Sequence, residues 1–120
     1  MLRKIAFRGK NRYRKEWLYG NLVQYKDGSF SIDGVPVETN SVGQFTGMLD
    51  KNGKEIYEGD VILQQGYSGK KPMLVRFEHG AFIVGWHGGS STATRPMLIQ
   101  KRCEVLGNIY DNPELISKKQ

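Results

Sequence analysis

The stretch LYGNLVQYKDGSFSID, residues 18–33, decides the expected fold. Two runs rich in β-branched and aromatic residues, 18–25 and 29–33, flank the turn residues Lys26, Asp27 and Gly28. Asp-Gly between such runs is a strong β-hairpin signal, because both central residues of a type I′ turn adopt positive φ. This stretch therefore predicts an antiparallel pair of strands.

The same pattern of short apolar runs and Gly-containing turns recurs along the chain. It predicts further strands at 5–8, 61–65, 73–78, 81–86, 97–99 and 103–106, separated by turns or loops at 9–11, 50–54, 58–60, 64–72, 79–80 and 87–96. The segment 35–40 is predicted to be a connector, the segment 42–49 shows no decisive pattern, and the loop at 87–96 is expected to be flexible.

These elements predict a mainly β fold in one domain, residues 1–120. About seven short strands joined by hairpins favour a small antiparallel curled sheet or a partly open SH3-like barrel. Asn112, Pro113 and Glu114 have the order of an N-cap, a first-turn proline and an early acidic residue, which predicts a short C-terminal helix.

Cysteine usage and hydropathy suggest where such a chain resides. The only cysteine, Cys103, cannot form an internal disulfide, and no Cys/His set with zinc-ligand spacing surrounds it. No apolar run approaches the roughly 20 residues that span a bilayer, and no signal peptide is evident. We therefore expect a cytoplasmic protein without a membrane segment, a metal or another cofactor.

The positive charge is concentrated in a basic N-terminal segment, residues 1–15. This segment has seven basic side chains and no acidic one, whereas residues 16–120 have eleven basic and twelve acidic side chains. The net charge of +6 therefore arises from the first fifteen residues. A local cluster of this kind can present several charges to one polyanion.

Basic and aromatic residues alternate in this part of the chain. If residues 8–14 were extended, their even-numbered basic side chains would share one face, opposite the aromatic ones. Such a surface can neutralise phosphates and stack bases. The candidate nucleic-acid-binding residues are Arg8, Lys10, Arg12, Tyr13, Arg14, Lys15 and Trp17. Alternatively, these charges are solvated and discourage edge-to-edge pairing of strands.

Most of the large aromatic residues are expected to pack in the core and turns. They are Trp17, Tyr19, Phe45, Tyr57, Phe77, Phe82 and Trp86. If one or two of them were exposed, they would suit either base stacking or a homo-oligomeric interface.

Catalytic motifs are weak in this chain. Asp50, Glu55, Glu58 and Asp60 could be imagined as a metal-binding or hydrolytic set, but turn chemistry explains their positions better. Neither a nucleophile elbow nor a phosphate-binding loop is present, and His79 and His87 border turns. We therefore predict a non-enzymatic binding protein, with a metal-dependent enzyme as a remote alternative.

Three stretches of the chain resemble the YopX family of phage and prophage proteins. They are IAFRGK (5–10) with WLYG (17–20), VGQFTG (42–47) continuing to DKNGKEIYEGDVI (50–62), and EVLGNIYDNPEL (104–115). The resemblance implies a protein made in the cytoplasm of a bacterial host and able to self-associate. It implies no catalytic residues.

The leading functional hypothesis is nucleic-acid binding through the basic segment. Little base specificity is expected, because the sequence has no recognition helix or base-reading motif. The alternative is a protein-interaction module that binds a host or phage factor through the same charges.

Overall fold

The computed structural model describes residues 3–64, 72–85, 95–96 and 103–116. In the N-terminal half the strands are β1 (Phe7–Lys10), β2 (Trp17–Gly20), β3 (Leu22–Gln24), β4 (Phe30–Ile32), β5 (Val35–Val37), β6 (Gly43–Leu49) and β7 (Glu55–Tyr57). They are followed by β8 (Asp60–Gln64), β9 (Met73–Glu78), β10 (Ala81–Gly85), β11 (Arg95–Pro96) and β12 (Cys103–Asn108). Two single 3₁₀ turns, η1 (Thr39–Ser41) and η5 (Pro113–Leu115), complete the elements described.

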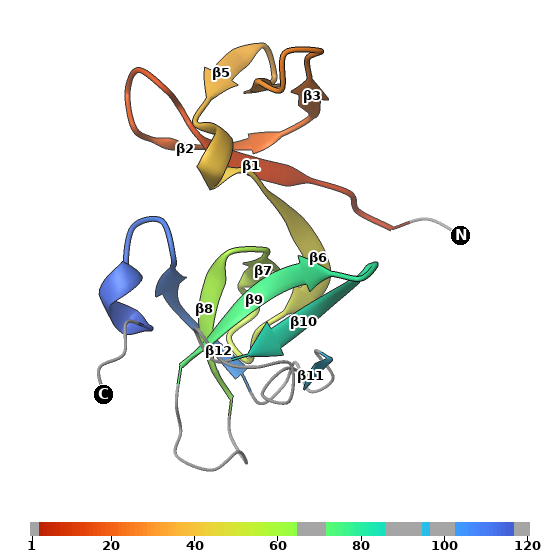
Figure 1. Cartoon of the computed structure of the whole chain (residues 1–120). Helices are drawn as coiled ribbons and strands as arrows, with labels where there is room; N and C mark the ends of the chain where they lie inside the picture. The colour runs from red at the N-terminus through yellow and green to blue at the C-terminus, as the bar shows by residue number, and fades with distance from the viewer. Residues whose placement is uncertain (1–2, 65–71, 86–94, 97–102, 117–120) are drawn as a thin grey trace.

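These strands form three antiparallel sheets (Figure 1). Their strand orders are β2-β1-β6-β7, β3-β4-β5 and β11-β10-β9-β8-β12. Figure 1 shows the long β6 running from the N-terminal strands to the part of the molecule that holds β7, β8 and β9. The mainly β, antiparallel prediction is confirmed. Each sheet keeps two edge strands, so within the described residues none closes into a barrel.

The β3–β4 hairpin forms where Asp27 and Gly28 predict it, but its turn is not type I′. Only Gly28 has a positive φ, of 91°, and its N–H donates to the Tyr25 carbonyl (2.9 Å). The Asp27 carboxylate accepts the Ser29 N–H (2.9 Å) and so holds the turn locally. The result is a type I turn closed by a left-handed glycine.

Two-residue turns with both φ values positive occur at two other hairpins. One is the predicted β9–β10 hairpin, where His79 and Gly80 have φ of 53° and 82°. The other joins β4 to β5 at Asp33 and Gly34, with φ of 49° and 85°. The prediction of a connector at 35–40 is therefore wrong for Val35–Val37, which form strand β5.

The predicted loop at 9–11 is also wrong, because β1 continues to Lys10. A Cβ built at Gly9 would lie 3.0 Å from Val37 Cβ, and Asn11 forms a β-bridge with Val37. This close approach of β1 to β5 explains a glycine inside a strand.

The C-terminal helix is not formed as predicted. Only the single 3₁₀ turn η5 is present, and no α-helix occurs in the described part of the chain. Asn112 does not cap this turn with its side chain, because its Oδ1 accepts the Asn108 N–H (3.2 Å) at the end of β12. The residues described also contain no helix long and apolar enough to cross a membrane.

Several predicted features lie outside the described residues, namely the strand at 97–99, Trp86, His87 and the loop residues 65–71 and 87–94. The end of the predicted flexible loop at 87–96 is described. There Arg95 and Pro96 form β11 and pair with β10, which corrects the loop prediction for these two residues.

The main core lies between the β8–β9–β10 strands, β7 and β12. Its buried members are Ile56, Ile62, Met73, Val75, Val84 and Cys103. A smaller cluster of Ala6, Phe45 and Tyr57 lies where β6 passes β1. The two clusters adjoin through β7, since Ile56 and Tyr57 are consecutive residues.

Gly43, the first residue of β6, leaves no room for a side chain. A Cβ built there would overlap the Glu58 carbonyl oxygen, which belongs to the backbone and cannot rotate away. We predict that Gly43→Ala lowers the free energy of unfolding by about 1–3 kcal/mol, as overpacking typically does. Urea unfolding followed by circular dichroism measures this loss.

Gly34→Asn is the matched control, because Gly34 has positive φ but open space around it. Asn adopts such φ values more readily than other side chains. A smaller loss for Gly43→Ala than for Gly34→Asn would contradict the packing that we describe.

Asp50 joins the β6–β7 turn to β12. Its Oδ1 accepts the N–H groups of Asn52 (2.8 Å) and Lys54 (2.9 Å), and its Oδ2 accepts that of Val105 (3.0 Å). Burial by itself would raise the pKa of Asp50, but these three N–H donors outweigh it and hold the pKa below its usual value.

A lowered pKa in the folded state predicts the direction of the pH dependence. The ionised Asp50 stabilises the fold above its unfolded pKa of about 3.9, and this contribution is lost as the pH falls through the lower folded pKa. The stability difference between the native protein and Asp50→Asn should therefore shrink below about pH 4. Urea unfolding across this range measures it, and a constant difference would contradict the assignment.

Candidate functional site

The basic N-terminal segment changes its conformation at Asn11. This residue is buried, and its Oδ1 accepts the N–H groups of Tyr13 (2.9 Å) and Arg14 (3.2 Å). Its backbone N–H donates to the Glu16 carbonyl (2.8 Å), and its carbonyl accepts the Lys15 N–H (2.9 Å). These bonds form a tight turn between β1 and β2, so the predicted extended basic face ends at Lys10.

Arg8 lies inside the protein rather than on its surface. The residue is only 6% exposed, and its Nη2 lies 2.7 Å from Oδ1 of Asp60, which is 2% exposed. The guanidinium carbon lies 4.7 Å from the ring centre of Trp17 and 5.0 Å from that of Tyr57. Arg8 is therefore not available to a polyanion, which corrects its assignment as a binding residue.

Arginine suits this position because its planar guanidinium is weakly hydrated and stacks on aromatic rings. Burial raises the pKa of Asp60, and the charge of Arg8 opposes that rise. The pair connects β1 to β8, two strands of different sheets.

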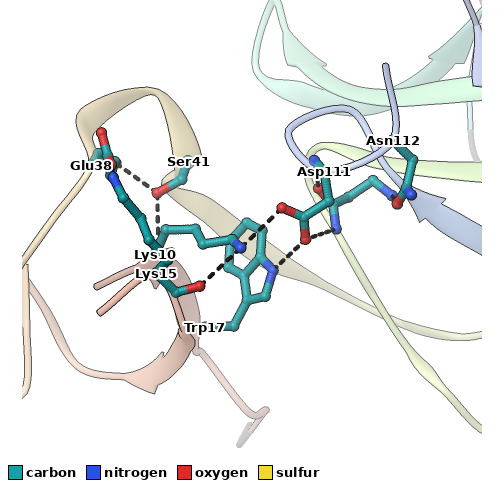
Figure 2. A network of polar contacts seen from close by, with 8 residues as sticks. Lys10, Lys15, Trp17, Glu38, Ser41, Asp111 and Asn112 are labelled. Atoms are coloured by element: carbon teal, nitrogen blue, oxygen red, sulfur yellow. Dashed lines mark hydrogen bonds and ion pairs between the residues drawn. The ribbon is translucent and has the colours of Figure 1, made fainter. Parts of the chain in front are cut away.

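A second polar network connects the same parts of the molecule nearer the surface (Figure 2). Lys10 Nζ lies 3.0 Å from Oδ1 of Asp111, and it also donates to the Lys15 carbonyl (2.9 Å). The indole N–H of Trp17 donates to Oδ2 of Asp111 (2.8 Å), and Asn108 Nδ2 donates to the same oxygen (3.3 Å). Partial burial would raise the pKa of Asp111, but these donors lower it overall.

Lys10 and Trp17 therefore act chiefly as structural residues. Both contact the turn that follows β12, and their partner Asp111 was not identified from the sequence. No local signal marks the contacts of Asp111 with Lys10 and Trp17, because these two residues lie at the opposite end of the chain. The turn at Asn11 could have been found, since an asparagine side chain that accepts backbone N–H groups two and three residues later is a common turn device.

The remaining candidate residues are presented to solvent by the β1–β2 turn. Arg12, Tyr13, Arg14 and Lys15 are all exposed, and Tyr13 is 73% exposed. Lys15 forms an ion pair with Glu38. Neither arginine has an ion-pair partner among the residues described. The pKa of Asp27 is lowered mainly by its hydrogen bonds from Ser29 and additionally by the charge of Arg12. We call Arg12–Arg14, with Tyr13 between the arginines, the basic turn.

The four acidic residues considered for catalysis are engaged in separate structural interactions. Asp50 holds three backbone N–H groups, Asp60 pairs with Arg8, and Glu55 pairs with Lys4 (2.6 Å). Glu58 lies half-buried, with Oε1 accepting the Gln44 N–H (3.4 Å). The described residues include no group of three or more His, Cys, Asp or Glu side chains placed to hold a metal ion.

The protein is a small antiparallel β protein in which the buried ion pair of Arg8 and Asp60 links two of the sheets. A family model described as "YopX protein" matches residues 6–117. The chain therefore belongs to the YopX family, as the resemblance of its sequence motifs predicts. None of the curated proteins matches it.

Two solved structures have a similar fold. The structure of protein EF1440 from Enterococcus faecalis has a TM-score of 0.62 and 22% sequence identity, covering 97% of this chain and 100% of that one. The structure of YopX from Bacillus subtilis has a TM-score of 0.59 and 21% identity, covering 93% of this chain and 98% of that one. At these identities the likeness establishes the fold alone.

The buried pair predicts a large effect when one partner is removed. Arg8→Met leaves Asp60 buried without its countercharge and should lower the free energy of unfolding by about 3–5 kcal/mol. Asp60→Leu should act similarly, and the double variant should lose much less than the sum of the two. Urea unfolding of the three variants gives this cycle.

Lys4→Met is the control, because it removes a cation from an ion pair that is exposed to water. Lys4 is paired with Glu55 at the surface, so its removal should change stability by less than about 1 kcal/mol. Additive losses for Arg8→Met and Asp60→Leu would show that the two side chains do not depend on each other.

Proposed function

We propose that this protein is a non-enzymatic binding protein that associates with single-stranded nucleic acid through the basic turn. The observation that supports this proposal is the presentation of Tyr13 between Arg12 and Arg14 on a turn that the buried Asn11 closes through hydrogen bonds. A preorganised turn loses little conformational freedom when a ligand binds.

Each side chain of the turn has a chemical role in this proposal. The two guanidinium groups neutralise neighbouring phosphates and release counterions. Tyr13 stacks on an unpaired base, which every base permits because each has a π face. Neither interaction reads a base edge, so the binding has little sequence preference.

The number of phosphate contacts is smaller than the charge of residues 1–15 suggests. Arg8 and Lys10 are committed to Asp60 and Asp111, and Lys15 is shared with Glu38. Among the candidate cations of residues 8–15, Arg12 and Arg14 remain, with Lys15 as a third. The setting that the family resemblance implies, a self-associating phage protein in a bacterial cytoplasm, stays a prediction.

Fluorescence anisotropy of labelled oligo(dT) against salt concentration tests the proposal. With two or three phosphate contacts, the logarithm of the affinity should fall against the logarithm of salt with a slope of roughly −1.4 to −2.1. The variant Arg12→Gln/Arg14→Gln should lose most of this slope and bind at least about tenfold more weakly near physiological salt. Tyr13→Leu should weaken binding by roughly 1–3 kcal/mol.

Lys51→Gln/Lys54→Gln is the matched control, since it removes the same charge from the exposed β6–β7 turn. This variant should bind oligo(dT) like the native protein. Equal losses in both double variants would attribute binding to net charge alone, and no binding by the native protein would favour the protein-partner alternative.

A further inference from the structure

The β3–β4–β5 sheet is extended by the chain that follows β1. Asn11 forms an antiparallel bridge with Val37 of β5, and the Arg12 N–H donates to the Pro36 carbonyl (3.0 Å). Residues 10–12 therefore lie beside β5 as a further strand of this sheet. The first residue of the basic turn is thus joined to the sheet that holds β3.

One row of residues crosses this extended sheet. Residues directly opposite each other in antiparallel strands share a face. Val23 is opposite Ser31, and Ser31 is opposite Pro36. Because the bridge pairs the residue before Arg12 with the residue after Pro36, Arg12 continues the row. Val23 is 46% exposed, and Pro36 and Arg12 are exposed as well, so this is the outer face of the sheet.

Tyr25 lies on the same outer face. It follows Val23 by two positions, so alternation directs both side chains to one side. Its hydroxyl shares a hydrogen bond with Ser31 Oγ (2.9 Å), and Ser31 is only 3% exposed. Because this bond joins neighbouring strands, the Tyr25 ring extends from the end of β3 towards β4. The residue is still 48% exposed, which leaves ring surface open to a ligand.

Arg12 and Tyr25 are close enough to contact one chain of nucleotides. Two strand spacings, about 10 Å, separate residues 10–12 from β4, towards which the ring extends. Both side chains also lie near the β3–β4 turn. Asp27 of this turn follows Tyr25 by two positions, and its pKa is lowered mainly by hydrogen bonds from Ser29 and further by the charge of Arg12.

We propose that single-stranded nucleic acid held at the basic turn continues across this outer face and stacks a second base on Tyr25. Sheets with exposed aromatic side chains bind single strands in this way, because each unpaired base has a π face. Arg12 belongs to both the turn and the face, and it neutralises a phosphate between the bases stacked on Tyr13 and Tyr25. A duplex, whose bases already stack on each other, gains nothing from Tyr25.

This inference deepens the proposed function and rests on it, since it adds a second contact to the same ligand. The two can fail separately. Arg12 and Arg14 supply charge, whereas Tyr25 supplies a ring, and the slope of affinity against salt depends on charge. Loss of the ring should therefore weaken binding without changing this slope.

Fluorescence anisotropy of labelled oligo(dT) with Tyr25→Leu provides the test. The affinity should fall at least about fivefold near physiological salt, while the salt slope stays that of the native protein. Tyr25→Phe keeps the ring and loses the hydroxyl, so it should bind within about threefold of the native protein. Native affinity in Tyr25→Leu would overturn the inference and leave the basic turn as the binding site. No binding by the native protein would overturn both.

Phe77→Leu is the matched control, because Phe77 is also 48% exposed but lies on β9 in another sheet. It should bind oligo(dT) like the native protein, and an equal loss in both variants would overturn the inference. If Tyr25→Leu does not fold, NMR titration of the native protein decides. Oligo(dT) should shift the amide signals of Val23, Tyr25 and Ser31. Unchanged signals, or equal shifts with a duplex of the same length, would overturn the inference.

Discussion

The ion pair between Arg8 and Asp60 is the interaction on which the arrangement of the sheets depends. Both residues are almost fully buried, so removing either one would leave the charge of the other buried without compensation. The rings of Trp17 and Tyr57 cover the guanidinium, and the buried Arg8 Nε has no hydrogen-bond partner among the residues that the structure describes. The Lys10–Asp111–Trp17 network adds a second connection at the rim.

This constraint divides the basic N-terminal segment into two parts with different roles. Before Asn11, the cations on β1 point to carboxylates of the C-terminal half and stabilise the fold. After Asn11, the turn directs Arg12, Tyr13 and Arg14 to solvent. The basic turn therefore extends from a strand that two ion pairs join to the rest of the protein. Net charge alone therefore overstates the number of cations available to a ligand.

The β3–β4 and β9–β10 hairpins could be predicted from the sequence because their signals are local: glycine at positive φ between strand-forming runs. The turn type at Asp27 and Gly28 could not, since the Asp27 carboxylate stabilises a competing turn through Ser29. The predicted first strand ends too early, at residue 8, because Gly9 resembles a loop residue. Only its contact with the distant Val37 explains a glycine within β1. The prediction of a C-terminal helix is wrong because the Asn112 side chain accepts the Asn108 N–H instead of capping the N-terminus of a helix.

Four of the candidate residues, Arg12, Tyr13, Arg14 and Lys15, lie at the surface, whereas the burial of Arg8 could not be predicted. Because most arginine side chains in proteins are exposed, the sequence predicts that Arg8 is accessible to a ligand. Its burial follows only from the contact with Asp60. That partner lies far along the chain, and a single sequence contains no sign of the contact.

The most direct test of this account is solvent exchange of the arginine Nε–H groups, measured by ¹H–¹⁵N NMR with and without oligo(dT). The account predicts that the Arg8 signal is shifted by the two rings, exchanges slowly with water and does not respond to the oligonucleotide. The signals of Arg12 and Arg14 should exchange fast and shift on binding. An Arg8 signal that exchanges as fast as those of Arg12 and Arg14 would contradict the buried pair, and with it the division of the basic segment.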